Sequence, residues 1–250
     1  MPAYPVRALV LRKTKLGEAD TIVTLLAEDG RQVRAVAKGA RKTMSRLGVR
    51  LEPFVVADLL LHTGRNLDIV AEARTVQSHE ALRSDFDRVT AGSVVSDVAD
   101  KLAVEGQAEE RLFALCLATL DAIELAPPDA LGALVAAFLV KAVSMHGLRP
   151  QLSSCAACAG ALAPGARFSS AQGGALCPDC GQLDPSAPPL SPEARDLLAA
   201  LLQARLVDVP ALAAAPDVVA EALRLLRAFI SYHVPARLKA LEFFLSQPRP

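Results

Sequence analysis

The residues best suited to chemistry are four cysteines in two Cys-x-x-Cys pairs, Cys155–Cys158 and Cys177–Cys180, separated by the 18 residues 159–176. Each pair lets one tight turn present two sulfurs to the same ion, and two such turns complete the tetrahedron that Zn²⁺ prefers. Four sulfur ligands leave no coordination position open for water or a substrate. The predicted zinc site is therefore structural and not catalytic.

The segment between the two pairs has the composition of a small hairpin. It contains Pro164-Gly165 and Gly173-Gly174, which favour turns, and few large apolar residues. Such a segment has little core of its own, so we expect metal binding to organise it into a zinc ribbon.

Disulfides would require an oxidising compartment, and no secretory apolar segment precedes the cysteines. A thioredoxin-like redox pair would have one Cys-x-x-Cys beside a βαβ unit. The fifth cysteine, Cys116, lies in an apolar helical stretch and is expected to be buried.

Charge is unevenly distributed along a chain whose net charge is zero. Residues 1–50 hold eleven Lys and Arg against four acids, a balance of +7, whereas residues 58–130 hold fourteen acids against six bases, a balance of −8. Phosphates bind through the summed contacts of Lys and Arg side chains, so the basic N-terminal part suggests a polyanionic partner. The acidic part is expected to face away from that polyanion or toward a basic protein.

Composition predicts a folded, mainly helical protein. The chain is 52% hydrophobic and 4% aromatic, without tryptophan, which favours packed helices and argues against disorder. The most apolar stretch, 130–140, ends at Lys141 and is shorter than the ~18 residues that span a bilayer. We therefore expect a soluble, cytoplasmic protein without a membrane partner.

Residues 1–76 have the pattern of a small β-barrel. Alternating or β-branched stretches predict strands within 6–11, 21–27, 32–37, 54–62 and 67–73, and Glu28-Asp29-Gly30-Arg31 is a strong hairpin signal. Five short strands in this length suit a five-stranded barrel of the oligonucleotide-binding type, the OB-fold. An SH3-like barrel remains the structural alternative.

Helical spacing of apolar residues begins after Ser78 and predicts helices around 86–102 and 112–123. Asp129 is the expected N-cap of a further helix that runs through 131–143 and stops at Gly147. Helices are predicted again over 197–206, 217–232 and 237–245, after a stiff Pro-rich linker at 184–189 and a helix start at Ser191-Pro192. The fold class is thus α+β and multidomain. The predicted domains are an OB-fold at 1–76, a helical bundle at 77–150, an inserted zinc ribbon at 151–183 and the continued helical bundle at 184–250.

The stretch 38–50 is the strongest candidate for contact with nucleic acid. It holds five bases and no acid, and its small residues predict a mobile loop between two barrel strands. The alternative is a solvated cationic loop. Lys42-Thr43 lacks the preceding glycine of a phosphate-binding loop, so nucleotide binding is excluded here. Tyr4 and Phe54 are the few aromatic residues of the barrel, so binding should be mainly electrostatic, with weak sequence preference.

No catalytic motif accompanies these features, and we do not expect an enzyme. The four histidines, at 62, 79, 146 and 233, are scattered and read as structural. A nuclease would need metal-binding carboxylates, for which Asp97, Asp100 and Glu105 are the nearest local group. An RNA-binding or translation-associated protein is a further alternative, because barrel and zinc ribbon also occur together there.

Several strings in this order resemble the RecO family of bacterial DNA repair proteins over nearly the whole chain. They are Lys38-Gly39-Ala40-Arg41-Lys42 and Arg50-Leu51-Glu52-Pro53-Phe54 in the basic barrel, and 146–152, His-Gly-Leu-Arg-Pro-Gln-Leu, leading into the cysteine pairs. The four cysteines match the zinc-bearing members of that family, while other members lack them.

The resemblance implies a recombination mediator that binds single- and double-stranded DNA and anneals complementary strands without nucleotide hydrolysis. It also implies RecR as a partner, help in loading RecA onto DNA coated by the single-strand binding protein SSB, and a nucleoid-associated location. The expected DNA contacts are Arg34, Lys38, Arg41, Lys42, Arg46 and Arg50, with Lys13 and Lys15 as weaker candidates.

The family further implies docking of the acidic, apolar tail of SSB on the helical region. Such a site needs basic residues beside an apolar groove. The candidate basic residues are Arg224, Arg227, Arg237 and Lys239, among Leu223, Leu226, Phe229 and Leu238. The alternative is the solvated edge of an amphipathic helix, which we favour.

Overall fold

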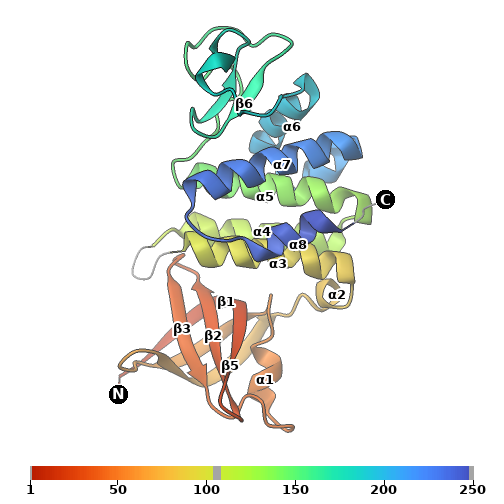
Figure 1. Cartoon of the computed structure of the whole chain (residues 1–250). Coiled ribbons are helices and arrows are strands. Elements are labelled where there is room, and N and C mark those ends of the chain that lie inside the picture. Colours follow the sequence, from red (N-terminus) through yellow and green to blue (C-terminus); the bar gives the residue numbers. More distant parts are fainter. Residues whose placement is uncertain (1, 104–107, 248–250) are drawn as a thin grey trace. The chain divides into compact units, whose positions relative to one another are not determined.

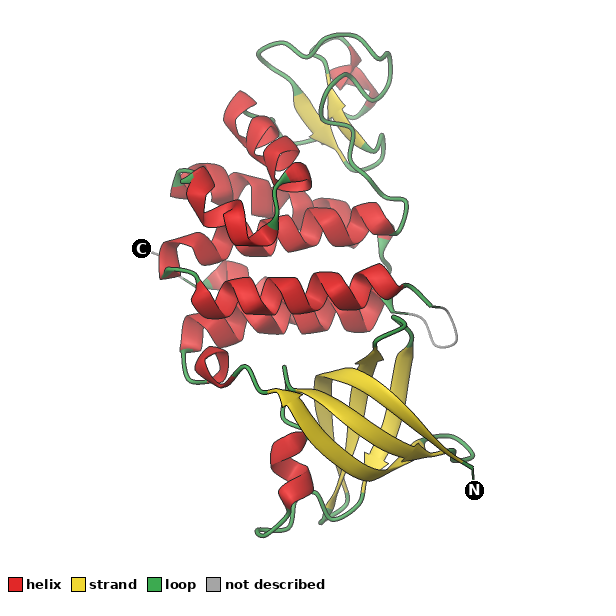
Figure 2. Cartoon of the chain, turned by 180° about the vertical axis from the view of Figure 1, so that it is seen from behind, coloured by secondary structure: helices red, strands yellow, loops and turns green. Residues whose placement is uncertain are grey.

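The computed structural model describes residues 2–103 and 108–247 (Figures 1 and 2). The chain forms two compact units, one of residues 1–92 and 96–124 and the other of 93–95 and 125–250. The domain boundaries expected from the sequence, at 76, 150 and 183, remain predictions.

The first unit begins with the predicted barrel. Its strands form a barrel (Figure 2). They pair in the closed order β1-β2-β3-β5-β4, with β3 and β5 parallel and β4 returning to β1. This closed order, in which β3 and β5 pair in parallel although all sequential strand pairs are antiparallel, is that of the OB-fold expected from the sequence. The strands are β1 Ala3–Leu16, β2 Asp20–Ala27, β3 Gln32–Ala37, β4 Val56–His62 and β5 Asp68–Gln77.

Alternation along the strands builds the barrel core. Apolar side chains such as Ala8, Val10, Val23 and Leu25 are fully buried on one face, since successive residues of a strand point to opposite faces. The register of β1 against β2 shifts between Val10 and Arg12, as a bulge does in a strongly curved strand. Phe54 is buried, as expected for a core residue.

The predicted mobile loop at 38–50 is wrong in its second half. A short helix, α1 Arg46–Arg50, forms there, and the Ser45 side chain accepts the Gly48 N–H at its start. The first half consists of turns that are held in place. Gly39 donates its N–H to Asp20, and Arg41 donates its backbone N–H to the Ala19 carbonyl.

Three helices complete the first unit: α2 Glu80–Arg83, α3 Phe86–Leu102 and α4 Glu110–Leu125. Asp85 caps α3 by accepting the Arg88 N–H, and Cys116 of α4 is fully buried, as predicted. His79 connects the barrel to α4. Its Nδ1 donates to the Phe54 carbonyl at 2.7 Å, and its Nε2 lies 3.0 Å from Asp121. It is thus a structural residue within this unit.

The second unit is built on α5 Leu131–Met145, α6 Pro192–Gln203, α7 Pro216–His233 and α8 Lys239–Ser246, with a 3₁₀ segment at Leu206–Leu212. Ser191 caps α6, and Pro192 takes its first position, as predicted. Two expectations were wrong. Asp129 is not the N-cap of α5, because a 3₁₀ turn, Pro128–Ala130, precedes that helix, and α6 ends at Gln203 before the predicted 206.

The expectation that no apolar stretch reaches the length of a membrane span is wrong. The segment Pro128–Met145 is long and apolar enough by length and composition, because a single Asp and a single Lys are tolerated within it. In the structure 72% of this segment is buried, as in a helix at the centre of a helical core.

Candidate metal centre and nucleic-acid interface

The two Cys-x-x-Cys turns lie at one end of a two-stranded sheet in the second unit, formed by β6 Arg167–Ser169 and β7 Gly174–Leu176. The hairpin turns where the sequence predicted it. Gly173 and Gly174 both have positive φ, and a Cβ on Gly174 would lie 2.3 Å from the Gln151 carbonyl oxygen. The adjacent core is very small, comprising Leu176, Cys155 and Cys177 with a few half-buried neighbours.

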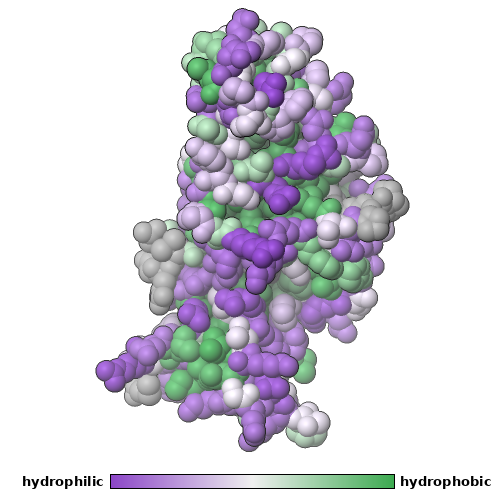
Figure 3. Space-filling model, in the orientation of Figure 1, coloured by the Kyte–Doolittle hydropathy of each residue, from purple (hydrophilic) through white to green (hydrophobic). Residues whose placement is uncertain are grey.

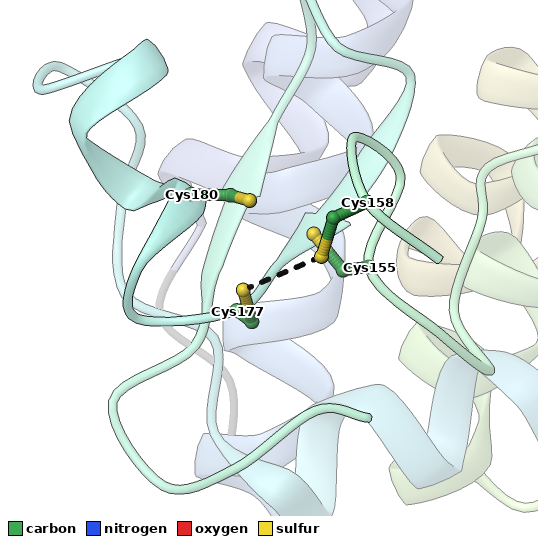
Figure 4. A group of neighbouring side chains, drawn as sticks. All are labelled: Cys155, Cys158, Cys177 and Cys180. Carbon is green, nitrogen blue, oxygen red and sulfur yellow. Dashed lines mark hydrogen bonds between the residues drawn. The ribbon is translucent and has the colours of Figure 1, made fainter. Parts of the chain in front are cut away.

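The four cysteine side chains point toward one another (Figure 4), and their sulfurs all lie within 4.8 Å of each other. The Cys158 and Cys177 sulfurs are 3.9 Å apart. A tetrahedral zinc site with bonds of ~2.3 Å has sulfur–sulfur edges of about 3.8 Å, so the residues fit this metal. Among the described residues, this is the one cluster of three or more cysteine, histidine or acidic ligands.

The turn backbone favours thiolates at the cluster. Burial alone would raise the pKa of the Cys155 thiol, but hydrogen bonds from the backbone N–H groups of Cys177 and Cys158, among others, outweigh it and lower that pKa to about 6. The hydrogen bonds that Cys180 makes with Cys158 and Cys177 raise its own pKa. One ligand is thus ready to bind a metal at neutral pH, and the others ionise as the metal arrives.

The ribbon is anchored to its surroundings in the same unit. Phe168 of β6 is buried against Phe229 of α7, with ring centroids 5.8 Å apart. The predicted stiff linker at 184–189 runs beside β6, where Arg167 donates to the carbonyls of Ala187 and Pro185. Asp184 accepts the Ser169 hydroxyl at 2.6 Å.

The predicted DNA contacts fall into separate places on the barrel. Lys38, Arg41 and Lys42 lie in the turns after β3, next to the β1–β2 turn, where the Arg41 side chain donates to the Gly17 carbonyl. Lys15 is exposed near the end of β1, close to that turn. Within the described residues, Lys15, Lys38 and Lys42 have no side-chain partner, so their charges are available to a ligand.

Arg46 and Arg50 lie one helical turn apart on α1 and line an open groove of about 720 Å³ between that helix and strands β4 and β5. Arg50 also donates to the Ala73 carbonyl at 2.7 Å. Arg34 is exposed on β3 and is not among the residues that line this groove. Lys13 is half-buried and bonded to Glu52 at 2.7 Å and to the Gly48 carbonyl, so it mainly supports α1.

Two cations near these residues were missed by sequence reasoning. Arg74 of β5 lines the groove and shares Asp58 of β4 with Arg7 of β1. Arg12 of β1 stands in the same cross-strand row as Thr24 and Arg34. Their positions in strands of alternating pattern could have indicated that these side chains are exposed. Only the strand register, however, shows which basic residues lie close together.

The alternative sites receive little support. Asp100 is engaged by Arg12, Lys101 and Gln32, and Glu105 lies outside the described residues. Leu223, Leu226, Phe229 and Leu238 are all buried and pack in the core. Of the basic residues beside them, Arg224 and Arg227 are exposed on α7 and Lys239 is exposed on α8, while Arg237 is exposed just before α8, and the SSB-tail site stays a prediction.

Comparison with known proteins covers almost the entire chain. The family model described as "Recombination protein O N terminal" matches residues 1–79, and "Recombination protein O C terminal" matches residues 83–242. The DNA repair protein RecO of Nocardioides sp. (strain JS614) is 40% identical over 244 residues, which are 96% of this chain and 98% of the relative. The DNA repair protein RecO of Roseiflexus sp. (strain RS-1) is 37% identical over 241 residues, 96% of this chain and 84% of the relative.

Proposed function

The chain belongs to the RecO family of DNA repair proteins, non-enzymatic recombination mediators, and on that premise we propose that it binds single- and double-stranded DNA and anneals complementary strands. The observation that carries this proposal is the accessible cationic surface of the barrel. Lys15, Lys38 and Lys42 are exposed beside the β1–β2 turn, and Arg46 and Arg50 line the groove at α1.

Annealing requires a surface that neutralises the phosphates of two strands and leaves their bases free to pair. Most contacts should therefore go to the backbone, which makes affinity strongly dependent on salt and weakly dependent on sequence. The barrel suits this demand, because its Phe54 is buried and the Tyr4 hydroxyl is bonded to Asp68. The DNA contacts proposed are Arg34, Lys38, Arg41, Lys42, Arg46 and Arg50, with Lys15 and, more weakly, Lys13.

Binding to oligo-dT over a salt series tests the loop contacts. A Lys38→Glu and Lys42→Glu double variant should bind all sequences more weakly, and the slope of log K against log salt should fall by about 1.4, or ~0.7 for each lost phosphate contact on a single strand. Arg111→Glu, a charge reversal on α4, is the matched control and should leave the slope unchanged. An unchanged slope in the double variant would refute the loop assignment.

We infer that the four cysteines hold a structural Zn²⁺. The sulfur separations, the thiolate-favouring turn and the very small core of the ribbon support this inference. The metal would cross-link the two turns, and the closed ligand set supplies no catalytic function.

RecR and the SSB tail are the protein partners that family membership suggests, with assistance to RecA loading as the outcome. Sedimentation tests both partners: the purified chain is mixed with RecR, and separately with SSB that has or lacks its tail.

The RNA-binding alternative is tested by comparing the affinities for oligo-dT and oligo-U. A nuclease would cleave either oligonucleotide in the presence of Mg²⁺.

A further inference from the structure

A pocket with an apolar floor and an acidic rim lies in the second unit, beside α6 and the segment that leads into α7. Its volume is about 380 Å³, near the lower end of the ~300–1,000 Å³ that ligand pockets occupy. Glu193 and Asp196 are the acidic residues of its lining, and we call it the acidic pocket. The other lining residues are apolar: Leu197, Ala200, Leu212, Ala214, Ala215 and Val218.

The segment 209–216 supplies half of this apolar lining and has an unusual composition. Its sequence is Val-Pro-Ala-Leu-Ala-Ala-Ala-Pro, eight residues without a polar side chain. Surface loops are usually polar, because water surrounds them, so an exposed apolar loop beside a pocket indicates a surface that another molecule covers. The exposed residues of the segment are Ala211, Leu212, Ala213, Ala215 and Pro216.

Helix α6 presents the acidic rim. Glu193, Asp196, Leu197 and Ala200 follow the spacing i, i+3, i+4 and i+7, which places them on one face of the helix. Glu193 is exposed and, among the described residues, has no ion-pair partner. Arg195 bonds to Asp196 at 2.8 Å but lines a different cavity, on another face of α6. The rim therefore keeps an excess of negative charge.

Glu221 of α7 adds a third carboxylate where the two helices begin. It accepts the N–H and the hydroxyl of Ser191, the N-cap of α6, at 2.8 Å each. It follows Val218 of the lining by three residues, so it lies on the same face of α7. This charge repels phosphates and acidic peptides. The complementary occupant is a basic segment with apolar side chains.

The chain itself carries such a segment in the first unit. The basic loop, residues 38–50, holds five basic residues and no acid. Two of its apolar side chains stand in solvent, since Met44 is 91% exposed and Val49 is 71% exposed. Hydrophilic side chains gather over α1 on the face drawn in Figure 3. Phosphate contacts use charge and no apolar surface, so DNA binding leaves the exposure of Met44 and Val49 unexplained.

We propose that copies of this chain associate head to tail, the basic loop of one copy docking in the acidic pocket of the next. Lys42 and Arg46 flank Met44 in the sequence. The apolar side chain that enters the pocket thus has a cation on either side for Glu193 and Asp196 of the next copy. Methionine suits this place, because its flexible, unbranched side chain fills irregular gaps.

The contact joins two different surfaces of one chain, so it is heterologous. Copies joined in this way continue into an open chain or close into a ring. The basic loop is also a DNA contact of the proposed function, and a docked loop cannot hold DNA at the same time. Self-association and DNA binding should therefore exclude each other, a consequence that rests on the proposed function.

Sedimentation velocity of the full chain at low salt tests the contact. The weight-average sedimentation coefficient should rise with protein concentration and fall when added salt screens the charges. A pocket variant, Glu193→Lys with Asp196→Lys, should weaken association about 10-fold or more. The matched control, Glu110→Lys with Asp129→Lys, reverses two exposed acids outside the pocket and should associate like the unchanged chain.

A mixture of two variants is the decisive measurement. The loop variant, Lys42→Glu with Arg46→Glu, should associate as weakly as the pocket variant when each is alone. The pocket variant keeps an intact basic loop and the loop variant keeps an intact acidic pocket, so an equimolar mixture should regain association. Recovery in the mixture also shows that both variants are folded.

Met44→Ser separates the apolar contact from DNA binding. It should weaken association several-fold and leave the affinity for oligo-dT and its salt slope unchanged, because no charge is lost. Oligo-dT added to the unchanged chain should disperse the associated copies. If the variants behave as expected and oligo-dT disperses nothing, the head-to-tail contact stands and the DNA role of the basic loop fails.

A sedimentation coefficient that does not change with protein concentration would overturn the proposal. Association that survives in the pocket variant would do the same, as would a mixture that stays dissociated although circular dichroism shows both variants folded. A chain that stays monomeric while its pocket binds a helical peptide of leucine and lysine would assign the pocket to another protein, and would equally overturn self-association.

Discussion

At the scale of single residues, the cysteines show how spacing alone can specify a site. Two Cys-x-x-Cys turns need only local backbone geometry to bring two sulfurs together, so both halves of the cluster were predictable. The hydrogen bonds to the Cys155 sulfur could not be predicted in the same way, because one of them comes from the backbone of Cys177, twenty-two residues away.

Replacing Cys155 and Cys158 by Ser should abolish zinc binding and destabilise the ribbon. Apparent binding free energies of about 10–16 kcal/mol for structural zinc in small domains show how much folding such a site can drive. Zinc content by mass spectrometry of the native protein should fall from one ion to none. Cys116→Ser is the matched control, since the buried Cys116 belongs to no cluster, and should keep its zinc. A full complement of zinc in the double variant would refute the site.

Zinc retention should also depend on pH in a defined direction. The Cys155 pKa of about 6 means that its thiolate persists at neutral pH and gains a proton as the pH falls through that value and below. Since protons compete with the metal for sulfur, acidification should release zinc and alkaline conditions should retain it. A chromogenic chelator gives the release curve, and retention that is independent of pH down to 4 would contradict the proposed thiolate ligands.

Asp58 is a residue whose role appears only in the structure. It accepts from Arg7 at 2.8 Å and from Arg74 at 2.6 Å, and these bonds lower its pKa. The lowered pKa means that the pair contributes to stability at neutral pH, and that this contribution is lost as the pH falls below the ordinary range of an aspartate. No sequence pattern marks this triad, because its members lie on three different strands.

Substituting Asp58 by Asn should strengthen DNA binding while slightly reducing stability. The change leaves Arg74 in the groove without its anion, beside Arg46 and Arg50. One additional cation should increase affinity for oligo-dT a few-fold at low salt and steepen the salt slope by about 0.7. Glu80→Gln on α2, which removes one exposed acid of the same unit, is the control. If Asp58→Asn bound like that control, the groove would not be a phosphate site.

At the scale of elements, the strands were predicted more completely than the basic loop. Alternation in β1 to β5 depends on local burial, and each predicted strand is present. Helix α1 was missed because it is short and begins inside a run of basic and small residues. It forms because Leu51 is buried in the barrel core and Ser45 caps its start, which are tertiary and local contacts that no periodicity reveals.

Helix α6 gives a test of the capping argument. Ser191 accepts the Ala194 N–H at 3.0 Å and donates its hydroxyl to Glu221 of α7 at 2.8 Å. Ser191→Ala loses both bonds and should lower the free energy of unfolding by about 1–2 kcal/mol, at the upper end for an N-cap. Urea unfolding followed by circular dichroism measures this loss. Ser191→Asp, which retains the cap but repels Glu221, should separate the contribution of the cap from that of the bond to Glu221. Equal stability of all three proteins would show that the Ser191 cap does not stabilise the protein.

At the scale of the whole molecule, two compact units, each with its own core, raise the question of how they unfold. The sequence predicted barrel, helices and ribbon in the right order, but the grouping of α2, α3 and α4 with the barrel was not foreseen. That grouping depends on side-chain contacts such as His79 to Phe54 and Gln32 to Asp100, which join residues 25 and 68 positions apart.

We expect the full chain to unfold in two calorimetric transitions, one for each unit. The proposed zinc site lies entirely in the second unit, where Phe168 and Phe229 join the ribbon to α7. The Cys155→Ser and Cys158→Ser double variant should therefore lower the temperature of one transition and leave the other in place. His79→Ala, which removes the side-chain contacts of His79 with Phe54, Gln77 and Asp121 in the first unit, should do the opposite. A single transition that shifts as a whole in both variants would show that the two units fold as one cooperative body, and that loss of zinc weakens the barrel as well.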